Sequence, residues 1–271
     1  MRIMIVLGGL LMLLISCSGK TEDKAEKPAT PKAVSGEISY AVDTTTMKGY
    51  IAYPANIEGR KPGILVVHEW WGHTAYARKR ADMLADLGYV ALAVDMYGNG
   101  TTVDHPKDAQ KFAMSVMGNF DTAKKRFQKA LDVLKADSHV DTSRIAAIGY
   151  CFGGSVVLSM VNAGLDLDAV AAFHAGLQLP VMPQEGIHTK VLVCNGAADP
   201  MVPQKDAEAF KAALDAAGID YKYVSYEGAL HAFSNPDATE LGKKFNLPIA
   251  YDAKADTASW NEMKNFFKTS L

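Results

Sequence analysis

The sequence predicts an α/β protein with a mainly parallel central sheet and helices on both of its faces. Two observations indicate this fold class. Apolar runs at residues 64–67, 90–94 and 191–194 are short and continuous, as in strands that are buried on both faces. The stretches between such runs carry apolar residues at helical spacing, and this alternation is typical of parallel sheets. No internal repeat or shift in composition marks a second folded domain.

The first predicted elements are a hairpin, a strand, a helix and a second strand. Residues 37–53 have a strand-like pattern with three threonines, 44–46, between two runs, which indicates a hairpin at one edge of the sheet. The strands at 64–67 and 90–94 enclose a helix that ends at Gly88. The apolar face of this helix consists of Ala77, Ala81 and Leu84.

The rest of the chain continues the same alternation. The further strands are expected at residues 145–148, 169–173, 191–194 and 221–224. The apolar faces of two further helices consist of Ala123, Phe127, Ala130, Leu131 and Leu134, and of Ala207, Phe210, Leu214 and Ala217. Gly218 closes the second of these helices. Residues 99–120 have no clear pattern, and by position alone they are a candidate cover for a pocket.

Composition bounds the function. The chain has 271 residues, of which 49% are hydrophobic and 21% charged, which is enough apolar material for a full globular core. Its formal net charge of −2 and the lack of a polybasic run argue against a nucleic-acid partner, because such proteins present a basic surface to phosphates.

The N-terminal sequence predicts export and lipid attachment. Residues 1–16 carry one positive charge followed by an apolar stretch too short to span a bilayer, as in a signal peptide. The end of this stretch, Leu-Ile-Ser-Cys, resembles the bacterial lipobox, which would make Cys17 the lipidated residue; an ordinary secretory signal is the alternative. Residues 17–35 then form the lipidated cysteine and a flexible tether, and residues 36–271 the folded domain. We expect a bacterial envelope protein, anchored to the outer membrane and facing the periplasm.

Each of the three cysteines has its own expected role. Besides Cys17, Cys194 lies inside an apolar run and is expected to be a buried, inert core residue. Cys151 lies in the turn Gly-Tyr-Cys-Phe-Gly-Gly between a strand and a helix, where a side chain is held out for attack. A bridge between Cys151 and Cys194 is the competing interpretation, and it would abolish such chemistry.

A cysteine nucleophile needs a histidine to take its proton and a group to orient that histidine. His231 and Asp199 supply both residue types downstream, and nucleophile, acid, histidine is the chain order of the triad in the α/β-hydrolase fold. Taken one by one, Cys151 could be structural, Asp199 a turn residue and His231 a surface histidine. Together with Glu69, however, all three follow predicted strands, so they should converge at one edge of the sheet.

From about residue 35 onward the chain resembles the dienelactone hydrolase family of α/β-hydrolases. The motifs that carry the resemblance are Gly149-Tyr150-Cys151-Phe152-Gly153-Gly154, His68-Glu69-Trp70-Trp71-Gly72, Gly196-Ala197-Ala198-Asp199-Pro200-Met201-Val202-Pro203 and Gly228-Ala229-Leu230-His231-Ala232-Phe233. The resemblance implies that Cys151 is the nucleophile, His231 the general base and then acid, and Asp199 the group that fixes the histidine tautomer. It also implies that Glu69 is an additional carboxylate that helps to hold the thiol and passes on its proton.

The expected reaction is hydrolysis of a small ester or lactone through a thioester acyl-enzyme, without a cofactor or metal. Attack on the carbonyl places negative charge on its oxygen, and the backbone N–H groups of Trp70 and Phe152 are positioned to receive that charge. His68 and His73 are spaced wrongly for a zinc-binding helix, so a metal site is not expected. His174 follows a strand but precedes Asp199, and it is a candidate pocket residue instead.

The chain departs from the family where the substrate carboxylate would be held. The resemblance implies that family members that cleave dienelactone hold its carboxylate with two arginines. The corresponding positions here are Asn99 and Asn235. A neutral amide cannot give the bidentate charged grip of arginine, so we expect dienelactone to be a poor substrate. Together with Asn99 and Asn235, four aromatic residues indicate an uncharged substrate pocket, namely Trp70, Trp71, Tyr97 and Phe233. Packing in the core is the alternative role for each of these aromatic residues.

Two other functions fit the same residues. A thioesterase or small peptidase would use an identical triad, because acyl transfer to sulfur begins in the same way. A lipid-anchored binding protein on an inactive hydrolase scaffold is the second alternative, although such a protein would be expected to have lost a triad member.

Overall fold

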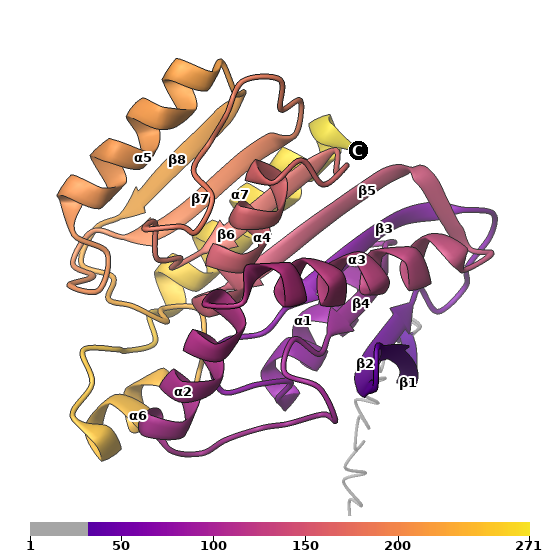
Figure 1. The fold of residues 1–271 in the computed structure, drawn as a ribbon, viewed down its shortest axis with the longest axis horizontal. Coiled ribbons are helices and arrows are strands. Elements are labelled where there is room, and N and C mark those ends of the chain that lie inside the picture. Colours follow the sequence, from indigo (N-terminus) through magenta and orange to yellow (C-terminus); the bar gives the residue numbers. More distant parts are fainter. Residues whose placement is uncertain (1–31) are drawn as a thin grey trace, which may run out of the picture. The chain divides into compact units, whose positions relative to one another are not determined.

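The computed structural model describes residues 32–271, so the expected signal peptide, Cys17 and most of the tether lie outside the described residues. Within this range an eight-stranded sheet has the strand order β1-β2-β4-β3-β5-β6-β7-β8 (Figure 1). The strands are β1 (Val34–Val42), β2 (Thr45–Tyr53), β3 (Lys61–Val67), β4 (Val90–Val94), β5 (Val140–Tyr150), β6 (Ala169–Phe173), β7 (Lys190–Gly196) and β8 (Tyr221–Tyr226). Strands β3 to β8 are parallel to one another, and β2 pairs antiparallel with β4, which confirms the predicted mainly parallel sheet.

Helices cover both faces of the sheet. They are α1 (Ala75–Asp86), α2 (Pro106–Met117), α3 (Phe120–Ala136), α4 (Phe152–Asn162), α5 (Gln204–Ala217), α6 (Ala238–Phe245) and α7 (Ala253–Ser270). Helices α1 and α7 contribute to one apolar core, while α3, α4 and α5 contribute to the core on the opposite face. Adjacent residues of β3 show the alternation, since Leu65 packs into one core and Val66 into the other. The predicted fold class is therefore confirmed.

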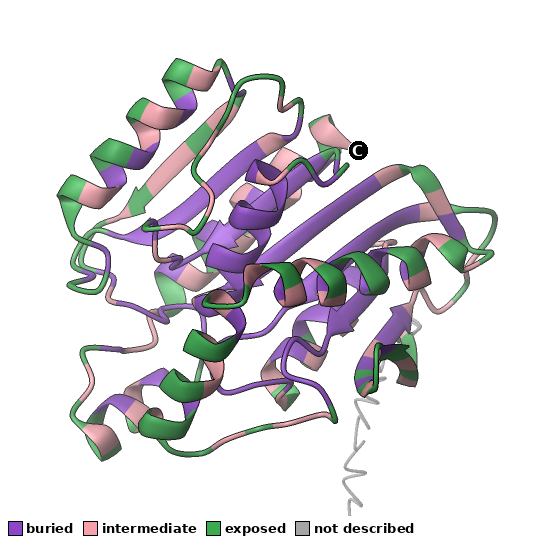
Figure 2. Ribbon diagram, viewed as in Figure 1, coloured by how far each residue is buried: buried purple, intermediate pink, exposed green. Residues whose placement is uncertain are grey.

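Burial explains why these strands read as continuous apolar runs. Every residue of β4 and β6 is buried, and the central strands form a buried band through the molecule (Figure 2). Strand β8 lies at an edge, and its residues are half-buried or exposed. The helices are amphipathic instead; on α3, for example, all five residues of the predicted face are buried.

The structure refines the expected hairpin. Strands β1 and β2 pair antiparallel, and β1 forms the edge of the sheet as predicted. The turn, however, lies at Asp43 and Thr44, while Thr45 and Thr46 already belong to β2. Asp43 has a φ of 50°, a left-handed conformation that aspartate tolerates better than a β-branched threonine.

Helices α2, α6 and α7 were not predicted; α2 and α6 lie in segments that connect the regular elements, and α7 follows the last predicted strand. Helix α2 begins with His105 as its N-cap and Pro106 at its first position. Within residues 32–271, no helix has the length and apolarity needed to cross a membrane.

Candidate active site

Cys151 lies on a strained turn between β5 and α4. Its backbone has φ 54° and ψ −116°, which places it outside the regions that side-chain-bearing residues usually adopt. Its N–H donates to the carbonyl of Phe173 at 2.9 Å, which ties the turn to the end of β6. Glycines make the turn possible, because a Cβ on Gly149 would lie 2.1 Å from the Gly153 carbonyl oxygen and one on Gly153 2.3 Å from the Val67 oxygen.

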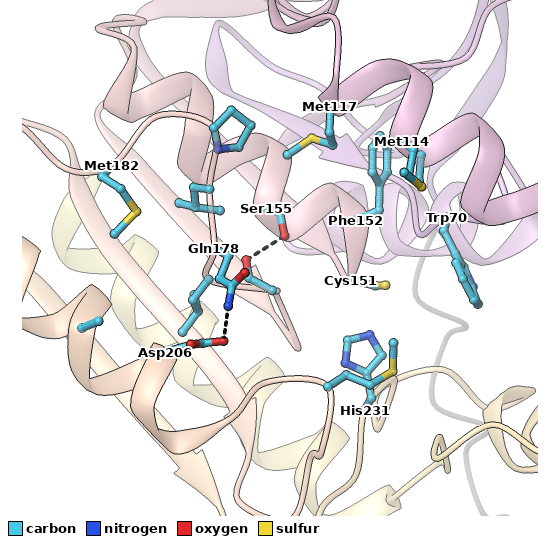
Figure 3. A pocket seen from close by; sticks show the side chains of 17 residues that line it. Trp70, Met114, Met117, Cys151, Phe152, Ser155, Gln178, Met182, Asp206 and His231 are labelled. Atoms are coloured by element: carbon cyan, nitrogen blue, oxygen red, sulfur yellow. Dashed lines mark hydrogen bonds between the residues drawn. The ribbon is translucent and has the colours of Figure 1, made fainter.

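Asp199 and His231 lie in the loops that follow β7 and β8. The Nδ1 atom of His231 is 2.8 Å from Oδ2 of Asp199, and the other carboxylate oxygen accepts a hydrogen bond from the Met201 N–H at 2.8 Å. This arrangement assigns the proton of the neutral ring to Nδ1 and leaves Nε2 as its acceptor atom. Figure 3 shows the His231 ring next to the Cys151 thiol at one end of a cavity.

The charges of its neighbours determine the protonation of His231. Burial on its own lowers the pKa of this histidine, but the negative charge of Cys151 as a thiolate and the hydrogen bond and charge of Asp199 raise its pKa to about 10. The Asp199 carboxylate therefore stabilises the protonated ring of His231 where it faces the Cys151 sulfur.

Glu69 follows β3 and is buried beside Cys151 and His231, with 4% of its surface exposed. Asn235 donates a hydrogen bond to its Oε2 from Nδ2 at 2.5 Å. Burial raises the pKa of Glu69, while the Asn235 hydrogen bond and the positive charges of His231 and Arg80 lower it, with a net value of about 7. A carboxyl group that exchanges its proton near neutral pH therefore lies beside the thiol.

Two backbone N–H groups are available beside the thiol. Phe152 is the first residue of α4, so its N–H belongs to the unpaired donors at a helix start. Trp70 follows Glu69, and its carbonyl accepts a hydrogen bond from the Tyr97 hydroxyl at 2.9 Å. Within residues 32–271 neither N–H donates a hydrogen bond. Both donors thus have the properties that an oxyanion site requires.

A cavity of about 590 Å³ opens from Cys151 and His231 and is mainly apolar (Figure 3). Its lining includes four methionines, Met114, Met117, Met182 and Met201. No lysine or arginine lines it, and its one acidic residue, Asp206, accepts a hydrogen bond from Gln178 at 3.0 Å. The cavity therefore suits an uncharged, apolar ligand.

Comparison with known proteins agrees with this site. A sequence profile of the dienelactone hydrolase family matches residues 47–271. The chain belongs to the dienelactone hydrolase family. It is 27% identical over 239 residues to Protein usf of Aquifex pyrophilus, covering 86% of this chain and 98% of that protein.

Solved structures extend the comparison. A dienelactone hydrolase-like promiscuous phosphotriesterase from metagenomic libraries matches with a TM-score of 0.81 and 32% identity, covering 88% of this chain and 99% of that one. Brefeldin A esterase shares the fold, with a TM-score of 0.63 and 16% identity over 89% of this chain and 78% of that one. The protein is thus a dienelactone hydrolase-like carboxylic ester hydrolase.

The predicted pocket residues of this family member do not lie together. Trp71 is buried and lines a small cavity beside Cys151, whereas Tyr97 lies behind Trp70 and Phe152. Phe233 is fully buried and packs against His174, so it is a core residue. None of Tyr97, Phe233, Asn99 and Asn235 lines either cavity at Cys151.

The two asparagines at the family's arginine positions do not line the substrate cavity, contrary to the prediction. Asn99 is exposed in a left-handed turn with φ 58°, and its N–H donates to Thr46 of β2 at 2.6 Å, so the chain turns there toward the hairpin and away from the site. Asn235 is buried and faces Glu69 instead of the large cavity. Neither asparagine therefore replaces a charged residue in the cavity. The cavity lacks a cationic clamp because no lysine or arginine lines it.

His68 and His174 have structural partners, whereas neither ring nitrogen of the buried His73 has a hydrogen-bond partner among the described residues. His68 is fully buried, with Nδ1 2.6 Å from the Glu69 carbonyl and Nε2 accepting from the Met96 N–H. His174 is also buried and bonds Ser234, so it does not line the large cavity. Across residues 32–271 no group of three or more His, Cys, Asp and Glu residues could hold a metal ion. Cys151 and Cys194 are both free, which excludes the alternative disulfide in this structure.

Most residues of the cavity wall were not predictable from the sequence. Met114 and Met117 lie on α2, and Gln178, Leu179 and Met182 lie in the irregular segment after β6. For α2, the sequence His105-Pro106 at its start was an available signal of a helix N-terminus. For the segment after β6, no periodicity or motif marked its residues as cavity lining.

Proposed function

We propose that this hydrolase cleaves uncharged carboxylic esters or lactones with an apolar body, using Cys151, His231 and Asp199 and a thioester acyl-enzyme. The observation that carries the proposal is the hydrogen-bonded pair of Asp199 and His231 beside a strained, cavity-facing cysteine. Family membership supports an ester or lactone substrate.

Acylation begins from the thiolate and the imidazolium. The thiolate attacks the carbonyl carbon, and the N–H groups of Trp70 and Phe152 receive the negative charge that develops on oxygen. His231 then donates its proton to the leaving alkoxide, the C–O bond breaks, and the alcohol departs. The products of this step are a thioester on Cys151 and a neutral His231.

Deacylation returns the enzyme to its starting state. Water attacks the thioester carbonyl while His231 Nε2 accepts one of its protons, and the C–S bond breaks with the electron pair going to sulfur. The carboxylic acid is released, and the thiolate and imidazolium are regenerated. In the first half of the cycle, Glu69 assists by holding the thiol proton when the ion pair is not formed.

The lining of the large cavity supports the choice of uncharged substrates. A carboxylate group entering it would meet no lysine or arginine and would approach Asp206. Dienelactone, an anion, should accordingly be turned over less well than neutral esters. The relative described as a promiscuous phosphotriesterase makes neutral phosphotriesters a second candidate substrate class, because they fit the same uncharged cavity.

The test is a panel of neutral esters, lactones, thioesters, a phosphotriester, a peptide substrate and a dienelactone. We expect p-nitrophenyl butyrate to be preferred to the dienelactone, and Cys151→Ala to lose at least about 10³-fold in kcat/KM. Cys194→Ala is the matched control, since Cys194 is fully buried in β7. Preference for thioesters or peptides would favour those alternatives, and ligand binding without turnover or labelling of Cys151 would favour a binding protein.

We also propose that the protein is anchored by lipid on Cys17 in a bacterial envelope, which only the N-terminal sequence supports. Metabolic labelling with a fatty-acid analogue should modify the full-length chain and leave Cys17→Ser unlabelled. Labelling of that variant would contradict the proposal.

A further inference from the structure

A second, small cavity touches the catalytic groups on another side. It has a volume of about 20 Å³, compared with about 590 Å³ for the large cavity. Four residues line both cavities, namely Trp70, Cys151, Met201 and His231. Cys151 thus lies at the boundary between a space that can hold a substrate and a space that cannot.

The volume of the small cavity matches one water molecule. A protein cavity needs roughly 10–15 Å³ to hold a water, so a space of about 20 Å³ has room for one and for no substrate group of useful size. The walls away from the catalytic groups are apolar and include Trp71, Leu247 and Ile249. Trp71 and Ile249 are themselves buried.

Polar groups at the other wall give such a water its hydrogen bonds. A buried water typically makes two to four of them. The Nε2 atom of His231 is buried and has no hydrogen-bond partner among the described residues. Glu69 uses one carboxylate oxygen for Asn235, and its other oxygen makes no hydrogen bond within residues 32–271. Once Cys151 is acylated and His231 is neutral, Nε2 and this carboxylate oxygen are two acceptors at a site of the right size, and a water molecule has two protons to donate.

We infer that the small cavity binds a single water molecule between Glu69 and His231, and that this water hydrolyses the acyl-enzyme. The inference rests on the proposed thioester mechanism. It assigns to Glu69 a catalytic role in the second half of the cycle, in addition to any role in holding the thiol.

The chemistry of the step follows from the two hydrogen bonds. The water donates one proton to Nε2 of the neutral His231 and keeps the other directed at the Glu69 carboxylate. Its oxygen forms the new bond to the thioester carbon, the C–S bond breaks, and sulfur leaves as the thiolate. The product is the free carboxylic acid, and His231 again carries the proton that it will give to the next leaving group.

Glu69 acts in this step only as a carboxylate, because a protonated acid would not accept the second hydrogen bond of the water. The pKa of Glu69 is about 7 while His231 is charged. In the acyl-enzyme His231 is neutral and no longer lowers this pKa, so deacylation should accelerate as the pH rises above neutrality. Removing the charge should remove this pH dependence.

Pre-steady-state kinetics of Glu69→Gln with p-nitrophenyl butyrate test the inference, because glutamine has nearly the same shape. We expect the burst of p-nitrophenol to keep its rate within about threefold, while steady-state turnover falls about 100-fold, the lower end of the range that proton-transfer assistance supplies. Intact-mass measurement should then show the butyryl group accumulating on Cys151. Deacylation by wild type should rise as the pH increases above about 7, and deacylation by the variant should not.

Glu58→Gln is the matched control, since Glu58 is exposed in the loop before β3. It should leave the burst and turnover unchanged. As a second variant, Glu69→Ala should regain deacylation on addition of formate, a carboxylate small enough for the enlarged cavity.

A burst that slows in parallel with turnover in Glu69→Gln, without acyl-enzyme accumulation, would overturn the inference and leave Glu69 with the thiol alone. If Cys151 takes up no acyl group in wild type or variant, and Cys151→Ala stays active, the proposed function fails and the inference fails with it.

Discussion

Two buried histidines lie side by side in this hydrolase, and one is neutral while the other is protonated. The rings of His174 and His231 are 5.3 Å apart, and both side chains are almost fully buried. Burial and the positive charges of His231 and Arg80 hold the pKa of His174 well below its usual range, whereas the pKa of His231 is raised to about 10.

The partners of the two rings explain the difference. His231 meets the Asp199 carboxylate and the Cys151 thiolate, whereas His174 meets the neutral hydroxyl of Ser234 at 2.8 Å, which in turn lies 2.7 Å from the Tyr76 hydroxyl. Burial therefore does not decide the charge of a histidine; the charge of its partner does. The structure confines the imidazolium to the one ring that faces the cavity.

Replacing Asp199 with asparagine should have the largest effect, because it removes the carboxylate that distinguishes His231 from His174. The amide can also stabilise the wrong tautomer, so kcat should fall by about 10³- to 10⁴-fold, as in serine triads. The pKa of His231, followed by NMR, should move toward its usual range. Unchanged kcat in a folded Asp199→Asn protein would contradict the triad.

Raising the pH should reduce the contribution of His231 to the free energy of unfolding. A histidine whose pKa is raised by folding contributes stability that is complete below its unfolded value of about 6.5 and is lost as the pH rises through about 10. Between pH 7 and 9 the free energy of unfolding should fall by about 1 kcal/mol per pH unit from this group. Urea unfolding at several pH values should show a steeper fall of the free energy of unfolding with pH for wild type than for His231→Gln. An equal pH dependence in the two proteins would refute this prediction.

Replacing His174 with phenylalanine should have the smallest effect on activity. The ring volume is kept, but Ser234 loses a hydrogen-bond partner, so the free energy of unfolding should fall by about 1–2 kcal/mol. The kcat should stay within about threefold, because a neutral His174 moves no proton in the reaction. Tyr76→Phe, which removes the hydroxyl on the other side of Ser234, is the matched control. A large loss of kcat at unchanged stability would show that His174 takes part in proton transfer.

The neighbours in the candidate site were predictable from the sequence. Cys151, Asp199 and His231 each follow a strand, and the carboxyl ends of parallel strands lie at one edge of the sheet. The fold class was predictable for the same reason, and it is confirmed. The chemistry assigned to these residues stays a prediction until the acyl-enzyme is observed.

The substrate cavity was much less predictable, because its walls come from segments without periodicity. Counting residues from a motif located Asn99 and Asn235 along the chain but not in space, since the direction of a left-handed turn depends on tertiary contacts such as the one to Thr46. Met114 and Met182 carried no signal at all, because an exposed methionine has no preferred role in a sequence pattern.

The glycines around Cys151 limit how this enzyme can be changed. A side chain at Gly149 or Gly153 would collide with main-chain atoms of the facing segments, which cannot retreat without moving β3 or α4. Laboratory evolution of new selectivity should therefore leave the bend untouched and collect its substitutions among the methionines on α2 and the loop after β6. Substitutions at these positions can change the shape of the cavity without disturbing the turn at Cys151.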